Sequence, residues 1–243
     1  MAKRLVASLL IGLFLALFLV PLGSIAARAA GPADGLYLMV QYAFGSLSLD
    51  AYYFKSGEVA RSPQGNVATL DFAALKRAAP WKVGTVTMAN DVMEIRWGDG
   101  STSKNSFEPE ANGSCFGFDA GTFCPVVGFK PGERLNGSFE GGLRASSDRN
   151  AATNARRIDF STDGHYAMDA VGSILDLEQK TDQVLGFSSG SEQGTYELNG
   201  TALTLHPAGR KPYVVLTFPY DVAGDPKKMP DHVYFGGTML KRL

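Results

Sequence analysis

Short stretches in which apolar and polar residues alternate recur through most of this chain, and such alternation is typical of β-strands. In Thr195–Leu198 the tyrosine and leucine share one face, while the threonine and glutamate share the other. Asn199-Gly200 predicts a two-residue hairpin turn, because both residues tolerate positive φ, and Leu203–Leu205 then resumes the alternation. Tyr213–Phe218 is more continuously apolar, which predicts a strand with little solvent on either face. We therefore expect an all-β protein built as an antiparallel meander.

One short helix is expected over Asp71–Ala79, where apolar residues follow helical spacing. Thr69 or Asp71 can cap its first turn, and Pro80 ends it. Val171–Leu185 is expected to be a single helical turn or a loop, and the polar run Ser188–Gly194 a solvated loop.

The first 29 residues have the pattern of a secretory signal peptide. Lys3 and Arg4 precede the apolar run Leu5–Val20, and Ala27-Arg28-Ala29 forms an A-x-A cleavage site. The alternative is an uncleaved membrane anchor, for which the run is marginally short. We therefore predict cleavage after Ala29 and export to the periplasm or the extracellular space, with no transmembrane segment in the mature chain.

Four segments recur in the same order in the two halves of the remaining chain. The clearest is Gly84–Ile95, which matches Gly194–Leu205 at an offset of 110 residues without a gap. The other pairs are Gly35–Leu38 with Gly137–Glu140, Tyr53–Val59 with Asp159–Tyr166, and Phe118–Phe123 with Tyr234–Met239. We predict an internal duplication into two tandem β units, residues 30–131 and 132–243, linked by the turn-rich Phe129–Glu133. The alternative is one larger barrel or sandwich over residues 30–243, to which each repeat contributes half of the strands.

Two cysteines, Cys115 and Cys124, lie in the expected mature part. In an oxidising compartment a disulfide is the default, and a hairpin turning at Asp119-Ala120 would set them opposite each other. Closing so short a loop stabilises by about 2–3 kcal/mol in the chain-entropy model. A catalytic thiol and a metal pair are the alternatives. The pair is expected in the first copy only, because the repeat aligns Leu240 with Cys124.

Charge argues against a nucleic-acid partner. Without Lys3, Arg4 and Arg28 the 23 basic residues fall to 20 against 24 acidic ones, a net charge of −4. Binding a phosphate backbone requires clustered Lys and Arg, and the sequence has no such cluster.

The sequence offers little catalytic or metal-binding chemistry. The histidines, His165, His206 and His232, fall in or beside different expected strands and have no ligand spacing. A Ser–His–Asp site stays open, since such sites are assembled in space. Asp163-Gly164 and Asp99-Gly100 are typical of turns rather than calcium loops. We therefore predict no catalytic residues, no metal site and no cofactor.

The order of these signals resembles bacterial lipocalin-like proteins of the calycin type. The resemblance rests on a Gly-x-aromatic opening at Gly137-Ser138-Phe139, then Gly194–Leu198 and Leu203–Leu205, and it is best over Leu135–Arg242. The usual lipocalin opening is Gly-x-Trp, and Tyr37 and Phe139 stand in place of that Trp. The resemblance implies small antiparallel barrels whose interior often holds an apolar ligand.

Six aromatic residues in expected strands serve either as core packing or as the lining of a cavity: Tyr37, Phe54, Phe139, Phe160, Tyr196 and Phe218. We consider three alternative functions for the whole protein. The first is a non-enzymatic exported protein that binds a small apolar or amphipathic ligand. The second is an envelope or extracellular interaction protein or inhibitor with a filled core and an unknown protein partner. The third is a hydrolase, which no group of candidate catalytic residues in the sequence supports.

Overall fold

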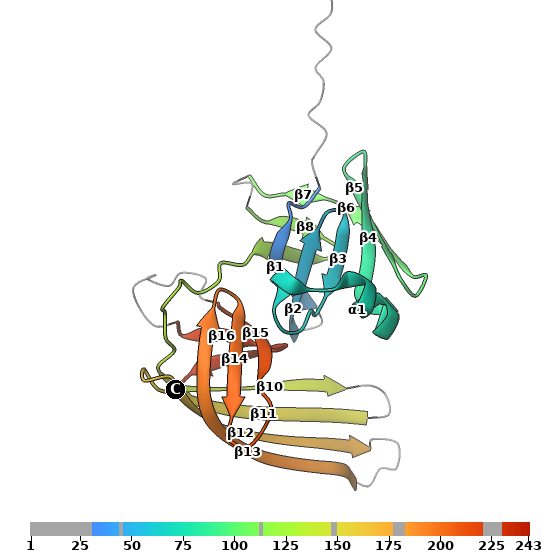
Figure 1. Ribbon diagram of the computed structural model, residues 1–243. Helices are drawn as coiled ribbons and strands as arrows, with labels where there is room; N and C mark the ends of the chain where they lie inside the picture. The colour runs from blue at the N-terminus through green and yellow to red at the C-terminus, as the bar shows by residue number, and fades with distance from the viewer. Residues whose placement is uncertain (1–30, 44–45, 112–113, 147–149, 177–182, 221–229) are drawn as a thin grey trace, which may run out of the picture.

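The computed structural model describes residues 31–43, 46–111, 114–146, 150–176, 183–220 and 230–243. The expected signal peptide, residues 1–29, lies outside the described residues. The described chain forms two antiparallel sheets, one from each half of the sequence, and a single α-helix (Figure 1). The prediction of an all-β fold with two units is therefore confirmed. No helix in the described part of the chain is long and apolar enough to cross a lipid bilayer.

The first sheet has nine strands in the order β6-β5-β4-β3-β2-β1-β9-β8-β7, so it curls almost into a barrel. Asn105 in β6 bridges the remaining gap, since its Nδ2 lies 2.7 Å from Oδ1 of Asp119 in the β8–β9 turn. The strands of this sheet are β1 Gly35–Ala43, β2 Ser46–Lys55, β3 Glu58–Arg61, β4 Val83–Ala89, β5 Val92–Trp97, β6 Thr102–Ser106, β7 Glu108–Pro109, β8 Phe116–Phe118 and β9 Gly121–Pro125.

The second sheet is a closed barrel in which eight strands follow one another in sequence order and β10 pairs with β17. Its strands are β10 Gly137–Ser146, β11 Asn150–Phe160, β12 His165–Asp176, β13 Gln183–Asn199, β14 Ala202–Pro207, β15 Tyr213–Pro219, β16 His232–Phe235 and β17 Thr238–Arg242. This meander is the barrel topology that the resemblance implied for the second half.

The duplication is visible in the register of the strands. Gly84 in β4 and Gly194 in β13 are the first residues to pair with the next strand in the two units, Gly84 with Trp97 and Gly194 with Pro207. A Cβ atom on Gly194 would lie 2.1 Å from the carbonyl oxygen of His206, and one on Gly84 would lie 3.2 Å from that of Arg96 and 2.6 Å from Ile95 Cγ2. The two copies therefore share glycine here because the next strand passes too close for a side chain.

The match at the end of each copy shifts by one residue from the alignment expected from sequence. Tyr37 pairs with Pro125 in the first unit, and Phe139 pairs with Arg242 in the second. Leu240 therefore corresponds to Phe123, whose side chain is buried like its own, and the counterpart of Cys124 is Lys241.

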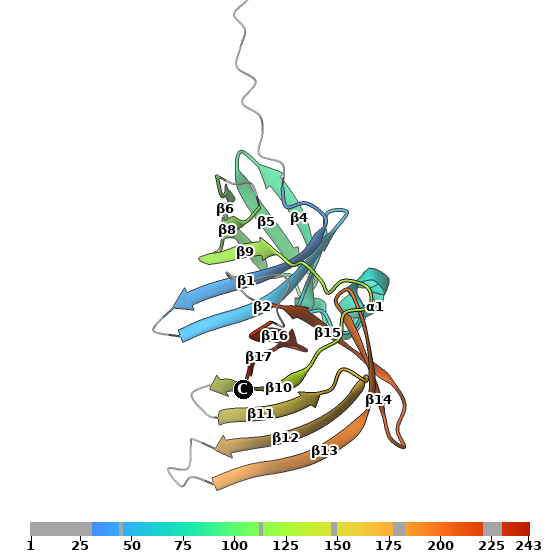
Figure 2. The ribbon, with the colours of Figure 1, turned by 90° about the vertical axis from the view of Figure 1, so that its left-hand side faces the viewer.

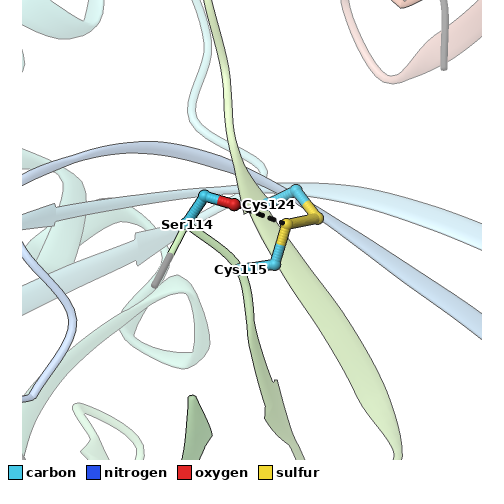
Figure 3. The surroundings of a disulfide bond; sticks show 3 residues. All are labelled: Ser114, Cys115 and Cys124. Atoms are coloured by element: carbon cyan, nitrogen blue, oxygen red, sulfur yellow. Dashed lines mark hydrogen bonds between the residues drawn. A yellow bond between two sulfur atoms is a disulfide. The ribbon is translucent and has the colours of Figure 1, made fainter. Parts of the chain in front are cut away.

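The disulfide forms as predicted between Cys115 and Cys124, whose Cα atoms are 4.3 Å apart (Figure 3). Asp119 and Ala120 both adopt positive φ, so the two-residue turn places the strands β8 and β9 in the expected register. The hydroxyl of Ser114 lies 3.9 Å from the sulfur of Cys115.

The predicted hairpin turn in the second copy is displaced by one residue. Asn199 pairs with Ala202, so the loop is Gly200-Thr201, with positive φ at the glycine only. This arrangement places glycine at the first loop position, as in type II′ turns. The first copy turns at Asn90-Asp91, both with positive φ, as expected.

The helix α1 spans Phe72–Ala78, and the Asp71 carboxylate caps it by accepting a hydrogen bond from the Ala74 amide at 2.9 Å. Two short 3₁₀ turns, η1 Val67–Thr69 and η2 Pro80–Lys82, flank it. Phe72 packs with Ala60 and Val83 against the outside of the first sheet.

Two expectations for the second half are wrong. Described parts of Val171–Leu185 extend β12 and β13, and Ser188–Gly194 lies within β13 instead of a solvated loop. The reason is tertiary: small and polar residues offer the same backbone donors and acceptors as any others, and β12 pairs with them along this run.

The apolar side chains form a core in each unit and a third cluster between the units. Tyr37 and Phe54 pack inside the first unit, and Phe139, Phe160 and Tyr196 pack inside the second. Phe218 instead faces outward and joins the cluster between the units. The first interior is dense in rings, and Phe116 stacks on Phe123 with centroids 4.9 Å apart.

Both faces of β15 are buried over Val215–Phe218, as the continuously apolar sequence predicted, while Tyr213 and Val214 are exposed. Val215 points into the second barrel, while Leu216 and Phe218 contact Leu36 and Leu38 of the first unit's cluster. Phe129, on the first-unit side of the expected boundary, packs in the second core and pairs with Gly200.

Candidate functional site

The three histidines lie apart, at the start of β12, in β14 and at the start of β16. His165 is exposed and its Nδ1 lies 3.1 Å from Asp163 Oδ2, and His206 Nε2 lies 3.8 Å from Glu197 Oε1. Among the described residues, no three His, Cys, Asp or Glu side chains are grouped so that they could hold a metal ion.

Ser161, Asp163 and His165 meet in the β11–β12 turn, beside an open surface hollow of about 560 Å³. Nucleophilic catalysis by serine requires a histidine that contacts the serine hydroxyl, and these residues are not arranged in that way. The Ser161 hydroxyl donates to Asp163 Oδ1 at 2.6 Å, and the histidine ring contacts Asp163 rather than the serine. Hydrogen bonds from Ser161 and from the His165 amide hold the pKa of Asp163 at about 2, so it is a poor base. The three residues therefore close a turn.

A second group of polar residues lies inside the second barrel, at the upper surface of its core. Cross-strand neighbours share a face of the sheet, so Phe139, Ile158, Met168 and Glu192 form one inward-facing row across β10–β13. Three members of this row are apolar, and the fourth is a carboxylate that is only 11% exposed.

The Glu192 carboxylate is held by three side chains. Oε1 accepts hydrogen bonds from the hydroxyls of Tyr166 at 2.6 Å and Tyr213 at 2.7 Å, and Oε2 lies 3.5 Å from Arg210 Nη1. Burial, and then the bond to Glu192, raise the pKa of both tyrosines, so both hydroxyls stay protonated as donors.

The next inward-facing row contains Gly141, Arg156, Ala170 and Gly190. Arg156 is the one long side chain in this row, and its guanidinium carbon lies 5.0 Å from the centre of the Phe235 ring. A Cβ atom on Gly190 would have nothing within 4 Å, so space is open beside this glycine, whereas a Cβ atom on Gly141 would lie 2.1 Å from the Met239 carbonyl oxygen. We call Arg156, Tyr166, Glu192, Arg210 and Tyr213 the polar floor.

The polar floor lies where the barrel opens. β13 pairs with β14 only from Gly194 onward, whereas its pairing with β12 continues to Gln183. The strands β10–β13 therefore run on past the shorter strands of the barrel (Figure 2). An open hollow of about 480 Å³, lined mainly by polar side chains, reaches Met168, Glu192 and Arg210 at this point.

Comparison of the chain with protein-family models, with curated proteins and with solved structures gives no match. The fold defines the class, a duplicated antiparallel β-barrel protein, and the resemblance to lipocalin-like proteins stays a prediction.

Sequence reasoning missed every residue of the polar floor. One signal was available: Arg156 has the same parity in its strand as Ile158 and Phe160, which places a cation on the apolar face. The weaker alternation in β13 hid Glu192, because glycine and serine flank it.

Proposed function

We propose that this protein is an exported, non-enzymatic binding protein that takes up a small amphipathic molecule above the polar floor of the second barrel. One observation carries the proposal. The row above the core consists of Gly141, Ala170 and Gly190 around a single long side chain, and space is open beside Gly190. Ligand sites of this kind combine apolar walls with a few convergent polar groups.

Export to the periplasm or the extracellular space is the second part of the proposal. The signal-like sequence of residues 1–29 and the Cys115–Cys124 disulfide support it, because disulfides persist in oxidising compartments.

The first unit supports the alternative, an interaction protein. Its interior is packed with stacked and edge-on rings, including Tyr52, Phe54 and Phe123. A filled barrel serves as a scaffold for its loops, so under this alternative the function belongs to the first unit's surface.

The test of ligand binding uses Nile red, a neutral apolar dye, and the full mature protein. We expect Gly190→Leu to weaken dye binding by about tenfold or more, because the new side chain fills the open space. Thr195→Leu is the matched control, since it places a leucine on the opposite face of β13, away from both hollows. Dye fluorescence titrations measure both, and absence of dye binding in the wild-type protein would refute the proposal.

A further inference from the structure

We infer that the molecule bound above the polar floor carries a carboxylate-type anionic group, and that Arg156 binds this group. The inference rests on the proposed function and names the chemical class of its ligand.

The first argument is that Arg156 has no hydrogen-bond partner among the residues that the structure describes. Its Nε is fully buried and makes no hydrogen bond, and no ion pair or hydrogen bond among the described residues uses its guanidinium. A buried donor without a partner costs free energy, and a buried cation costs more. A ligand that supplies acceptor oxygens at this position removes that cost.

The neighbouring residue, Arg157, shows that β11 does not prevent an arginine from forming an ion pair. Arg157 points to the outer face of β11, is 51% exposed, and lies 3.5 Å from the Asp159 carboxylate. Two adjacent arginines thus differ in that only the outward-facing one has a counter-ion.

The second argument is the charge of the polar floor. It contains two guanidinium groups, of which that of Arg210 is 70% exposed, and one carboxylate, which accepts hydrogen bonds from Tyr166 and Tyr213 and forms an ion pair with Arg210. The floor therefore has one positive charge in excess, and burial lowers the pKa of Arg156 by more than the nearby Tyr213 and Glu192 raise it.

The third argument is geometric. The Phe235 ring lies under the guanidinium, and space is open beside Gly190 in the same row, whereas β17 fills the space beside Gly141. A planar guanidinium presents a fork of N–H donors that matches the two oxygens of a carboxylate. The side chain of Met168, which is only partly buried where it packs on the core, then offers an apolar surface to the hydrocarbon part of the same molecule.

The test compares dodecanoate with dodecan-1-ol, which have the same chain and differ in the head group. Isothermal titration calorimetry of the full mature protein near neutral pH should show that dodecanoate binds at least about tenfold more tightly. Arg156→Gln should remove this preference by weakening dodecanoate binding at least about tenfold relative to the wild-type protein. Arg157→Gln is the matched control and should bind both dodecyl compounds as the wild-type protein does.

The outcomes separate the two proposals. If wild-type protein binds both dodecyl compounds equally well, the anion inference is overturned while ligand binding stands, and this comparison does not depend on any variant folding. An unchanged preference in Arg156→Gln overturns the role of that residue. If neither dodecyl compound nor Nile red binds, the proposed function itself fails.

Discussion

At the scale of single residues, the β11–β12 turn shows how side-chain contacts set an ionisation state. Asp163 accepts hydrogen bonds from the Ser161 hydroxyl and the His165 amide, and the histidine ring lies 3.1 Å away. Each of these contacts favours the charged carboxylate, which is why the pKa of Asp163 falls to about 2.

This shift predicts how Asp163 contributes to stability with pH. The folded pKa lies below the usual value of 3.8, so the contribution is present above about pH 4 and is lost as the pH falls towards 2. We expect Asp163→Asn to lower the melting temperature above pH 4 and the difference from wild type to shrink towards pH 2. Asp169→Asn, which changes an exposed carboxylate on the following strand, β12, is the control. Thermal unfolding by circular dichroism checks this, and a difference that stays constant with pH would contradict it.

At the scale of elements, β13 serves two structural roles along its length. From Gly194 to Asn199 it is a barrel strand that packs against β14, and from Gln183 to Gln193 it pairs with β12 beyond the end of β14. The change takes place at Gly194, where the Pro207 backbone approaches closely. The open end of the barrel therefore depends on how β13 and β14 meet at this glycine.

We expect Gly194→Ala to destabilise the protein by about 3 kcal/mol, the upper end of overpacking costs, because its Cβ would lie 2.1 Å from the His206 oxygen. Gly190→Ala is the matched control on the same face of β13, where a Cβ meets nothing within 4 Å. It should change stability by no more than about 0.5 kcal/mol. Urea unfolding measures both variants, and equal effects would show that the two strands are free to separate at Gly194.

At the scale of the whole molecule, an apolar interface joins the two units. Leu216, Phe218 and Tyr234 project from the outside of the second barrel and meet Leu36 and Leu38 of the first unit. Phe218 and Tyr234 stack with ring centroids 4.5 Å apart. The units therefore share buried surface, and we expect them to unfold together.

Both tryptophans of the chain, Trp81 and Trp97, lie in the first unit, so their fluorescence reports on that unit alone. We expect Leu216→Ala in the second unit to destabilise the protein by about 2–4 kcal/mol, since the side chain is fully buried. If the units are coupled, the urea midpoint measured by tryptophan fluorescence falls with the one measured by circular dichroism.

The control for this experiment is Val214→Ala, two residues along the same strand, where the side chain is 39% exposed. It should change stability by no more than about 0.5 kcal/mol. A tryptophan midpoint that stays at the wild-type value in Leu216→Ala would show that the units unfold independently.

The sequence by itself determined the features that depend on neighbours along the chain. Alternation gave the strands, Asp71 and Pro80 bounded the helix, and the spacing about Asp119-Ala120 gave the disulfide. Gly84 and Gly194 revealed the duplication because the same backbone approach requires glycine in both copies. These are local constraints, so a single stretch of residues contains the information.

Only the tertiary structure decided which strands pair and which side chains face one another. Ser188–Gly194 became a strand because β12 supplied its hydrogen bonds, and Phe218 became interface rather than core because a second unit covers that face. Arg156 and Glu192 face the same interior although 36 residues separate them, since barrel closure brings β11 and β13 around one axis. Pairing across a barrel depends on residues far apart in the chain, and no local pattern encodes it.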